Sequence, residues 1–220
     1  MRRRFDEQME ELNNMLIEMG SSIEEAISKA CTALLNQDVE LANEAILLEN
    51  DIDEQEREIE NFSMRLLTQQ QPIARDLRQI HAALKMITDM ERIGDHARDI
   101  SQLTIYIADQ RYIDNIEEIP KMAEAAIKMV TESIEAFVRK DTEMARGVIK
   151  YDDVIDKLFS DLKTQLFELI KMDVENGAQA LDFLMIAKYF ERIGDHAVNV
   201  AEWVYFSITG EHVKKRHGRG

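Results

Sequence analysis

The heptapeptide ERIGDHA occurs twice in this chain, at Glu91–Ala97 and again at Glu191–Ala197. The similarity extends beyond it, because LLNQDVELANEAI at 34–46 aligns with FVRKDTEMARGVI at 137–149. These two segments are 103 residues apart, whereas the two heptapeptides are 100 residues apart. The copies therefore differ in length by three residues, in the stretch that joins the segment to the heptapeptide. A length change confined to a connection leaves packed elements intact. The sequence therefore predicts two copies of one structural unit.

Each copy contains three helical segments. The chain has only 8 Gly and 2 Pro in 220 residues, and residues with high helix propensity dominate it. Asp38 and Asp141 are expected N-caps, each with an acid two residues later in the first turn. We expect helices over 6–36, from Asp38 to near Pro72, and over 73–109, and then over 119–139, from Asp141 to near Asn176, and over 178–208.

Apolar residues recur at alternating steps of three and four along the second and third segments of both copies. Such heptad spacing is typical of long helices that pack side by side. The predicted seam residues are Leu41, Ala45, Leu48, Ile52, Ile59, Phe62, Leu66, Met86, Met90, Ile93, Ala97, Ile100 and Thr104, with Met144, Val148, Tyr151, Ile155, Leu162, Gln165, Leu169, Ile186, Phe190, Ile193, Ala197, Val200 and Val204 in the second copy.

The pattern predicts an all-α fold made of two tandem antiparallel three-helix bundles related by internal duplication. The predicted units are 1–110 and 111–210, followed by a basic tail at 211–220.

The net charge of −16 argues against a nucleic-acid-binding surface, because phosphate contacts need an excess of Lys and Arg. No uncharged apolar stretch is long enough to cross a bilayer. Cys31 is the single cysteine, so no intramolecular disulfide can form and a reducing compartment fits. We therefore expect a cytoplasmic protein without a membrane span.

Acidic pairs spaced four residues apart border the predicted seams. Because the second and third helices of each unit are antiparallel around a short turn, their pairs should face each other. Four carboxylates then gather in one patch per unit, with Asp99 and the equivalent Asn199 one turn beyond. The pairs are Glu49 with Asp53 and Glu91 with Asp95 in the first copy, and Asp152 with Asp156 and Glu191 with Asp195 in the second.

Clustered carboxylates repel one another, so cations must compensate them. One interpretation uses arginines in an ion-pair network, with Arg92, Arg98 and Arg192 as the candidates. The other interpretation uses metal, since an all-carboxylate set suits hard cations. Gly94 and Gly194 inside predicted helices indicate close helix approach or space at the patch. His96 and His196 are either neighbours of the ligands or ordinary structural residues.

No catalytic machinery is evident in the sequence. A ferritin-like di-iron site needs Glu-x-x-His pairs, which neither copy supplies. There is also no nucleophile–base pairing, glycine-rich phosphate loop or HExxH motif. We therefore expect a protein that is not an enzyme and has no catalytic residues.

The duplicated three-helix unit, with an acidic pair in the second helix and ERIGDHA in the third, resembles the PhoU family of phosphate-uptake regulators over residues 5–208. The resemblance implies a cytosolic, often dimeric protein with metal ions at the acidic motifs. On this chain those motifs fall on Glu49, Asp53, Glu91, Asp95, Asp99, Asp152, Asp156, Glu191, Asp195 and Asn199. Metal identity stays open among divalent or iron ions (Mg, Mn, Fe or Zn).

The resemblance also implies a function. We expect a regulatory adaptor that represses the phosphate-starvation response and phosphate uptake, acting through the ATPase subunit of the phosphate ABC transporter and a sensor histidine kinase. Such partners would bring it to the inner face of the membrane. Two alternatives stay open, a metal-dependent enzyme that uses the carboxylate patches and a metal-free helical scaffold.

Overall fold

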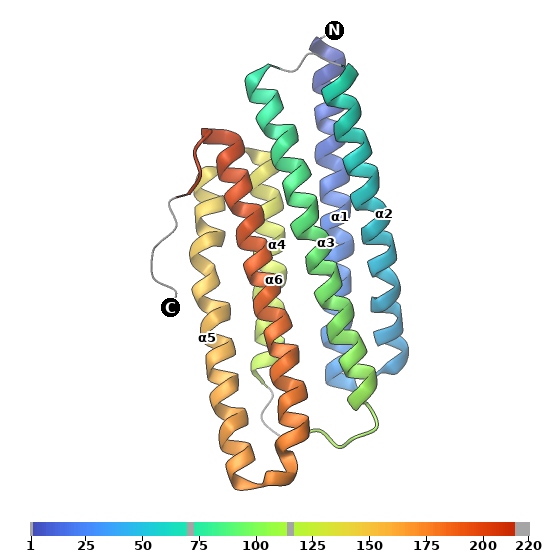
Figure 1. Ribbon diagram of the computed structural model, residues 1–220, viewed down its shortest axis with the longest axis vertical. Coiled ribbons are helices and arrows are strands. Elements are labelled where there is room, and N and C mark those ends of the chain that lie inside the picture. Colours follow the sequence, from blue (N-terminus) through green and yellow to red (C-terminus); the bar gives the residue numbers. More distant parts are fainter. Residues whose placement is uncertain (1, 70–72, 114–116, 214–220) are drawn as a thin grey trace.

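The computed structural model describes residues 2–69, 73–113 and 117–213. Within these residues there are six α-helices, one short 3-10 turn and no strand (Figure 1). The helices are α1 (Arg2–Asn36), α2 (Val39–Gln69), α3 (Ala74–Ile107), α4 (Glu118–Arg139), α5 (Thr142–Met172) and α6 (Gly177–Thr209). The predicted all-α fold with duplicated helices is confirmed. None of the described helices has the length and apolar character needed to cross a membrane.

The turn between the first and second helices is built in the same way in both repeats. Gln37 and Lys140, at equivalent positions, take up left-handed backbone conformations with φ of 55° and 57°. The next residue donates its backbone N–H to a carbonyl five residues back, which satisfies a helix C-terminus. Asp38 then accepts from the backbone N–H of Leu41, and Asp141 accepts from Glu143 and Met144. Both predicted N-caps are confirmed.

The two repeats pack side by side and antiparallel. In each, the second and third helices form a hairpin that packs against the first helix. Helices α3 and α6 lie together at the centre. The end of α2 and the start of α3 lie at the opposite end of the molecule from the α5–α6 turn (Figure 1). Helices α1 and α4 also contact each other. The arrangement brings the middles of α3 and α6, where the two heptapeptides lie, to the centre of the bundle.

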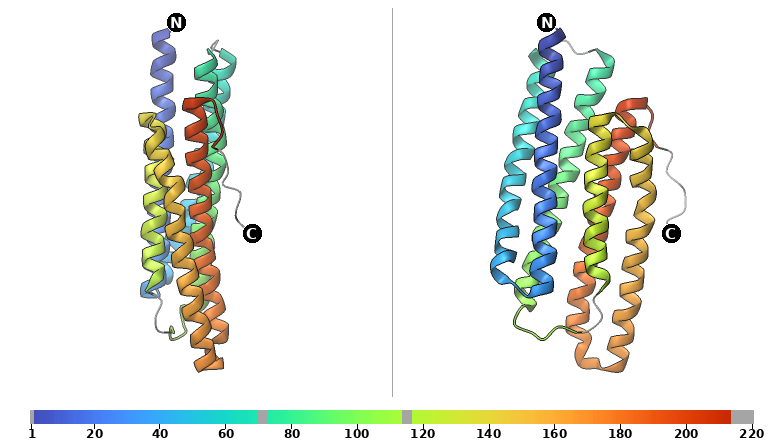
Figure 2. Two further views of the ribbon diagram at one scale, coloured as in Figure 1. Left: turned by 90° about the vertical axis from the view of Figure 1, so that its left-hand side faces the viewer. Right: turned by 180° about the vertical axis from the view of Figure 1, so that it is seen from behind.

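The first helices of the repeats differ in length. Helix α1 has 35 residues and α4 has 22. Both end at equivalent positions, Asn36 and Arg139, so the difference lies at their N-terminal ends. The α5–α6 hairpin consequently projects past the start of α4, whereas α1 runs along the α2–α3 hairpin to its tip (Figure 2).

One contiguous hydrophobic core runs through both repeats. Every predicted seam residue of the two third helices is buried. Those of the second helices are buried or partly buried, with Gln165 as the polar exception. The division at residues 110 and 210 stays a prediction, and residues 214–220 of the predicted tail lie outside the described part of the chain.

Candidate functional site: two carboxylate patches

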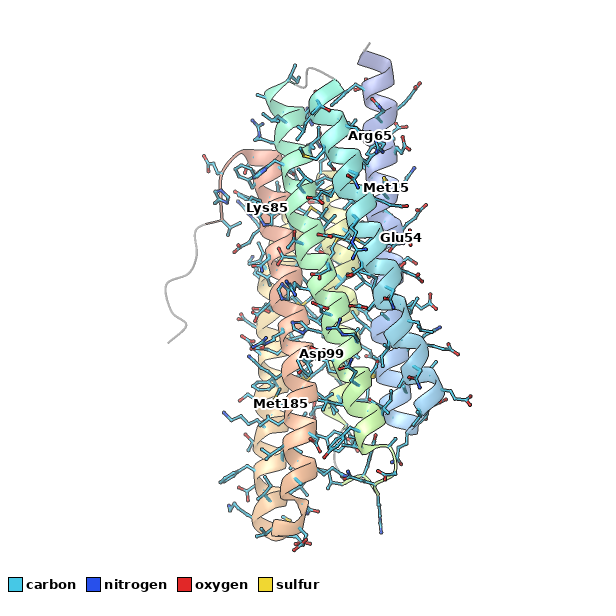
Figure 3. The ribbon with its side chains drawn as sticks, turned by 45° about the vertical axis from the view of Figure 1, so that its right-hand side comes forward. Met15, Glu54, Arg65, Lys85, Asp99 and Met185 are labelled. Carbon is cyan, nitrogen blue, oxygen red and sulfur yellow. The ribbon has the colours of Figure 1, made fainter. Side chains whose placement is uncertain are left out.

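The first patch lies between α2 and α3 and is centred on Arg98. Its guanidinium donates to Glu49 from α2 and, at 3.0 Å, to Asp95 on its own helix. Asp99 lies 3.5 Å away, and Figure 3 labels this residue on α3. Three of the predicted acids therefore converge on one cation, which is the ion-pair arrangement considered from the sequence.

Two further arginines border the same patch. Arg92 Nη1 donates to Asp95 Oδ2 at 2.8 Å, and Arg57 Nη2 donates to Asp53 Oδ2 at 3.2 Å. The guanidiniums of both are mostly exposed, whereas Asp95 is largely covered. Ion pairs with such exposed partners contribute little to stability. Their main effect is to reduce repulsion among the acids.

The electrostatics of the patch reflect this crowding. Partial burial, followed by the charge of Asp95, raises the pKa of Glu91 above its ordinary value. Burial, followed by Glu60 and Asp53, raises the pKa of Glu56 in the same direction. Burial opposes the charge of Arg98, yet Asp95, Glu49 and Asp99 together raise the pKa of its guanidinium. A cation at this position is thus stabilised by the surrounding carboxylates.

Gly94 sets the distance between the two helices that carry the patch. A Cβ added there would lie 3.1 Å from Ile52 Cδ1 and 3.2 Å from Ile52 Cγ2. In the second repeat, a Cβ on Gly194 would lie 3.0 Å from Ile155 Cδ1. Both glycines therefore permit close helix approach, as the sequence indicated. This close approach brings the acidic pairs of the two helices near each other.

The second patch lies between α5 and α6 and has a different set of cations. Lys188 Nζ donates to Glu191 Oε2 at 2.5 Å. Asp152 is only 2% exposed and lies close to Gly194. Asp156 and Asp195 are partly buried along the same pair of helices.

Two arginines of the first patch have no counterpart in the second. Val198 stands at the position equivalent to Arg98, and Ser160 at the position equivalent to Arg57. Arg192 alone is shared, as the equivalent of Arg92. The second repeat therefore keeps the four paired acids, has Asn199 in place of Asp99, and lacks two of the arginines.

A polar cluster joins α3 to α6 between the two patches. Asp89 of α3 contacts His196 Nδ1 at 2.8 Å and accepts from Asn199 Nδ2 at 2.9 Å. Asn199 thus faces the other repeat in this structure. The rings of His96 and His196 lie 5.5 Å apart, and His96 stacks on Tyr189 at the same distance. Burial, followed by the neighbouring His196, lowers the pKa of His96.

The donor set of both patches is carboxylate oxygen, which fits hard cations. In the first patch the Arg98 guanidinium already lies among the acids, so a metal ion there would have to displace it. Within the part of the chain that the structure describes, no three His, Cys, Asp or Glu side chains are already arranged as metal ligands. A metal ion bound at either patch would therefore require its own side chains to move.

Two contributors to the site were missed from the sequence. Glu56 couples electrostatically to Glu91, and it follows Glu49 by one heptad, a spacing that could have revealed it. Asp89 had no such signal, because its equivalent in the second repeat is Tyr189 and its partners come from the other repeat.

Comparison with known proteins identifies the family. The PhoU domain matches the chain twice, over residues 16–104 and 119–204. The chain belongs to the PhoU family. A phosphate-specific transport system accessory protein PhoU homolog from Clostridium acetobutylicum is 37% identical over 96% of this chain and 97% of its own length. The Aquifex aeolicus PhoU homolog is also 37% identical, over 96% of this chain and 95% of its own.

Solved PhoU structures share the fold along their whole length. The crystal structure of PhoU from Pseudomonas aeruginosa has a TM-score of 0.89 and 30% identity, covering 94% of this chain and 100% of that one. The phosphate transport system regulatory protein PhoU from Streptococcus pneumoniae has a TM-score of 0.87 and 26% identity, covering 96% and 100%. The resemblance expected from the ERIGDHA motifs is thereby confirmed.

Proposed function

We propose that this chain is a cytoplasmic regulatory adaptor that represses phosphate uptake and the phosphate-starvation response. The duplicated PhoU domain over most of the chain is the observation that carries the proposal. Relatives of nearly the same length bear the name of phosphate-specific transport accessory proteins. The adaptor would act as a homodimer that engages the ATPase subunit of the phosphate ABC transporter and a sensor histidine kinase, without catalysing a reaction.

Deletion of the gene tests the regulatory role. In phosphate-replete cells, the deletion should raise expression of phosphate-starvation genes, and the intact gene should restore repression. Unchanged expression would contradict the role. Co-purification of the tagged chain with the ATPase and the kinase, with and without chelator, tests the partners. Failure to recover either protein under both conditions would argue against the adaptor mechanism.

The two carboxylate patches are the proposed metal sites. Their oxygen donors suit Mg, Mn or Fe ions, with Zn as a further candidate. A bound ion would neutralise the acids and hold the hairpin helices together. The residues that would hold it are Glu49, Asp53, Glu91, Asp95 and Asp99 in the first patch and Asp152, Asp156, Glu191, Asp195 and Asn199 in the second.

Elemental analysis tests the metal proposal. The wild-type chain, purified without chelator, should retain metal that a variant with Glu91→Ala, Asp95→Ala, Glu191→Ala and Asp195→Ala loses. Equal metal content in the two proteins would favour the metal-free ion-pair scaffold. Partner binding that survives the same four substitutions would separate the scaffold role from metal binding.

A further inference from the structure

Among the residues that the structure describes, no third helix runs along the outer end of the α5–α6 hairpin. Helix α4 is thirteen residues shorter than its counterpart α1 and stops short of the hairpin tip (Figure 2). At 1.5 Å per residue, the missing segment corresponds to about 20 Å of helix. The second bundle therefore has two helices where the first has three.

The seam residues of α5 are less buried where the covering helix is missing. In the first repeat, Phe62 and Leu66 of α2 are buried, and α2 packs against α1. The equivalent residues of α5, Gln165 and Leu169, are only partly buried. A cavity of about 350 Å³ opens there, lined by Glu117, Glu118, Thr164, Gln165, Glu168, Leu169 and Met172. We call it the hairpin groove.

The hairpin groove combines an apolar floor with an acidic rim. Leu169 packs against the core, and the side chain of Met172 is 80% exposed. A flexible, polarizable methionine adapts to partner side chains of different shape. Three glutamates line the rim, and two of them form ion pairs with exposed lysines of their own helices, Glu118 with Lys121 and Glu168 with Lys171.

The acidic charge of the rim is not found at the equivalent position of the first repeat. Glu168 occupies the position equivalent to Arg65, which lies near the α2–α3 end of α2 (Figure 3). The covered hairpin and the uncovered hairpin thus carry opposite charges at this position. The substitution accompanies the loss of the covering helix.

We propose that the hairpin groove binds a basic amphipathic helix of another protein, which takes the place left by the shortened α4. The apolar stripe of such a helix would pack on Leu169 and Met172, in the manner of helix-in-groove recognition. Its Lys and Arg residues would lie against Glu117, Glu118 and Glu168. Charge disfavours an anionic lipid surface as the occupant, because the acidic rim repels it. This inference goes beyond the regulatory role and does not depend on it.

Binding of a designed peptide to the full-length chain tests the inference. The probe is a labelled helical peptide of leucine and lysine, with leucines at i, i+3, i+4 and i+7. A peptide of the same composition in scrambled order is its control. By fluorescence anisotropy, Glu168→Arg and Met172→Ser should each weaken binding of the amphipathic peptide by roughly tenfold. Gln165→Leu, which restores an apolar seam residue, should tighten it.

Matched variants separate specific docking from attraction to an acidic protein. Glu10→Arg makes the same charge change on α1, toward the opposite end of the molecule. Met64→Ser removes an exposed methionine from α2, where Met64 is 48% exposed against 80% for Met172. Both should leave binding unchanged. Equal weakening by Glu10→Arg, or equal binding of the scrambled peptide, would overturn the inference. It would also fail if Met172→Ser altered only sedimentation of anionic vesicles or self-association.

Discussion

Gly94 of α3 lies directly against Ile52 of α2, so close that a Cβ on the glycine would be 3.1 Å from Ile52 Cδ1. Ile52 is fully buried and has little room to move. Overpacking should therefore outweigh the helix propensity that alanine adds. We expect Gly94→Ala to lower the free energy of unfolding by roughly 1 kcal/mol in a denaturant titration. Adding Ile52→Val should partly restore it.

Gly147 provides the matched control, since it lies inside α5 with nothing within 4 Å of an added Cβ. Here only helix propensity acts, and Gly147→Ala should stabilise the protein by about 1 kcal/mol. If Gly94→Ala stabilised it equally, the close-approach explanation for the ERIGDHA glycine would be wrong.

The left-handed residue after α4 offers a stabilising substitution. Lys140 has φ of 57°, where a side chain is unfavourable and glycine is not. Lys140→Gly should raise the free energy of unfolding by about 1 kcal/mol. At the equivalent position, Gln37 Nε2 donates to Ala108 O at 2.9 Å and to Gln110 O at 2.6 Å. Gln37→Gly loses these bonds and should not stabilise. Thermal unfolding of both variants checks the contrast.

Tyr112 should make stability depend on pH in the alkaline range. Its hydroxyl is buried without a hydrogen-bond partner among the described residues, and burial raises its pKa to about 12. The folded state keeps this proton between pH 10 and 12 whereas the unfolded state loses it, so stability falls as pH rises through that window. Tyr112→Phe should remove this contribution and add about 1 kcal/mol near neutrality.

Tyr106 is the control for that experiment, because its side chain is 70% exposed. Tyr106→Phe should leave the stability near neutral pH unchanged. Urea titrations of the two variants and the wild type from pH 7 to pH 11 give the comparison. Identical slopes for all three proteins would contradict the assignment.

Arg98 should compete with metal for the first carboxylate patch. Arg98→Val introduces the residue found at the equivalent position of the second repeat and frees Glu49, Asp95 and Asp99 from one guanidinium. The metal-free variant should be less stable, while Mn²⁺ should bind about tenfold more tightly and raise its melting temperature more. Calorimetric titration checks the affinity. Arg139→Val, on exposed α4 surface, should change neither. Weaker Mn²⁺ binding by Arg98→Val would contradict the competition.

Much of the fold could be predicted from the sequence because its signals are local. Heptad spacing and the acids at Asp38 and Asp141 located helices and caps to within a few residues. The two copies of ERIGDHA and of the preceding segment revealed the duplication. The short turn between antiparallel helices then predicted that Glu49 lies near Asp95. All of this follows from periodicity and chain connectivity.

The rest depends on side-chain contacts between helices. Nothing in the local sequence indicates that Asp89 reaches His196 and Asn199, because the pairing arises from how α3 packs on α6. The choice of Arg98 as the central cation likewise depends on side-chain reach across α2 and α3. The shortened α4 was readable from Pro120, but its effect on the far end of α5 was not.

The shared core has a consequence for how the two patches respond to each other. Ile52 beneath one patch and Ile155 beneath the other belong to a single continuous apolar interior. Loosening one hairpin should therefore weaken support for the other, and we expect the two repeats to unfold together although each carries its own motif. A ligand that stabilises one repeat should therefore also stabilise the other. Because the two repeats share one core, either patch can affect the stability of the whole bundle.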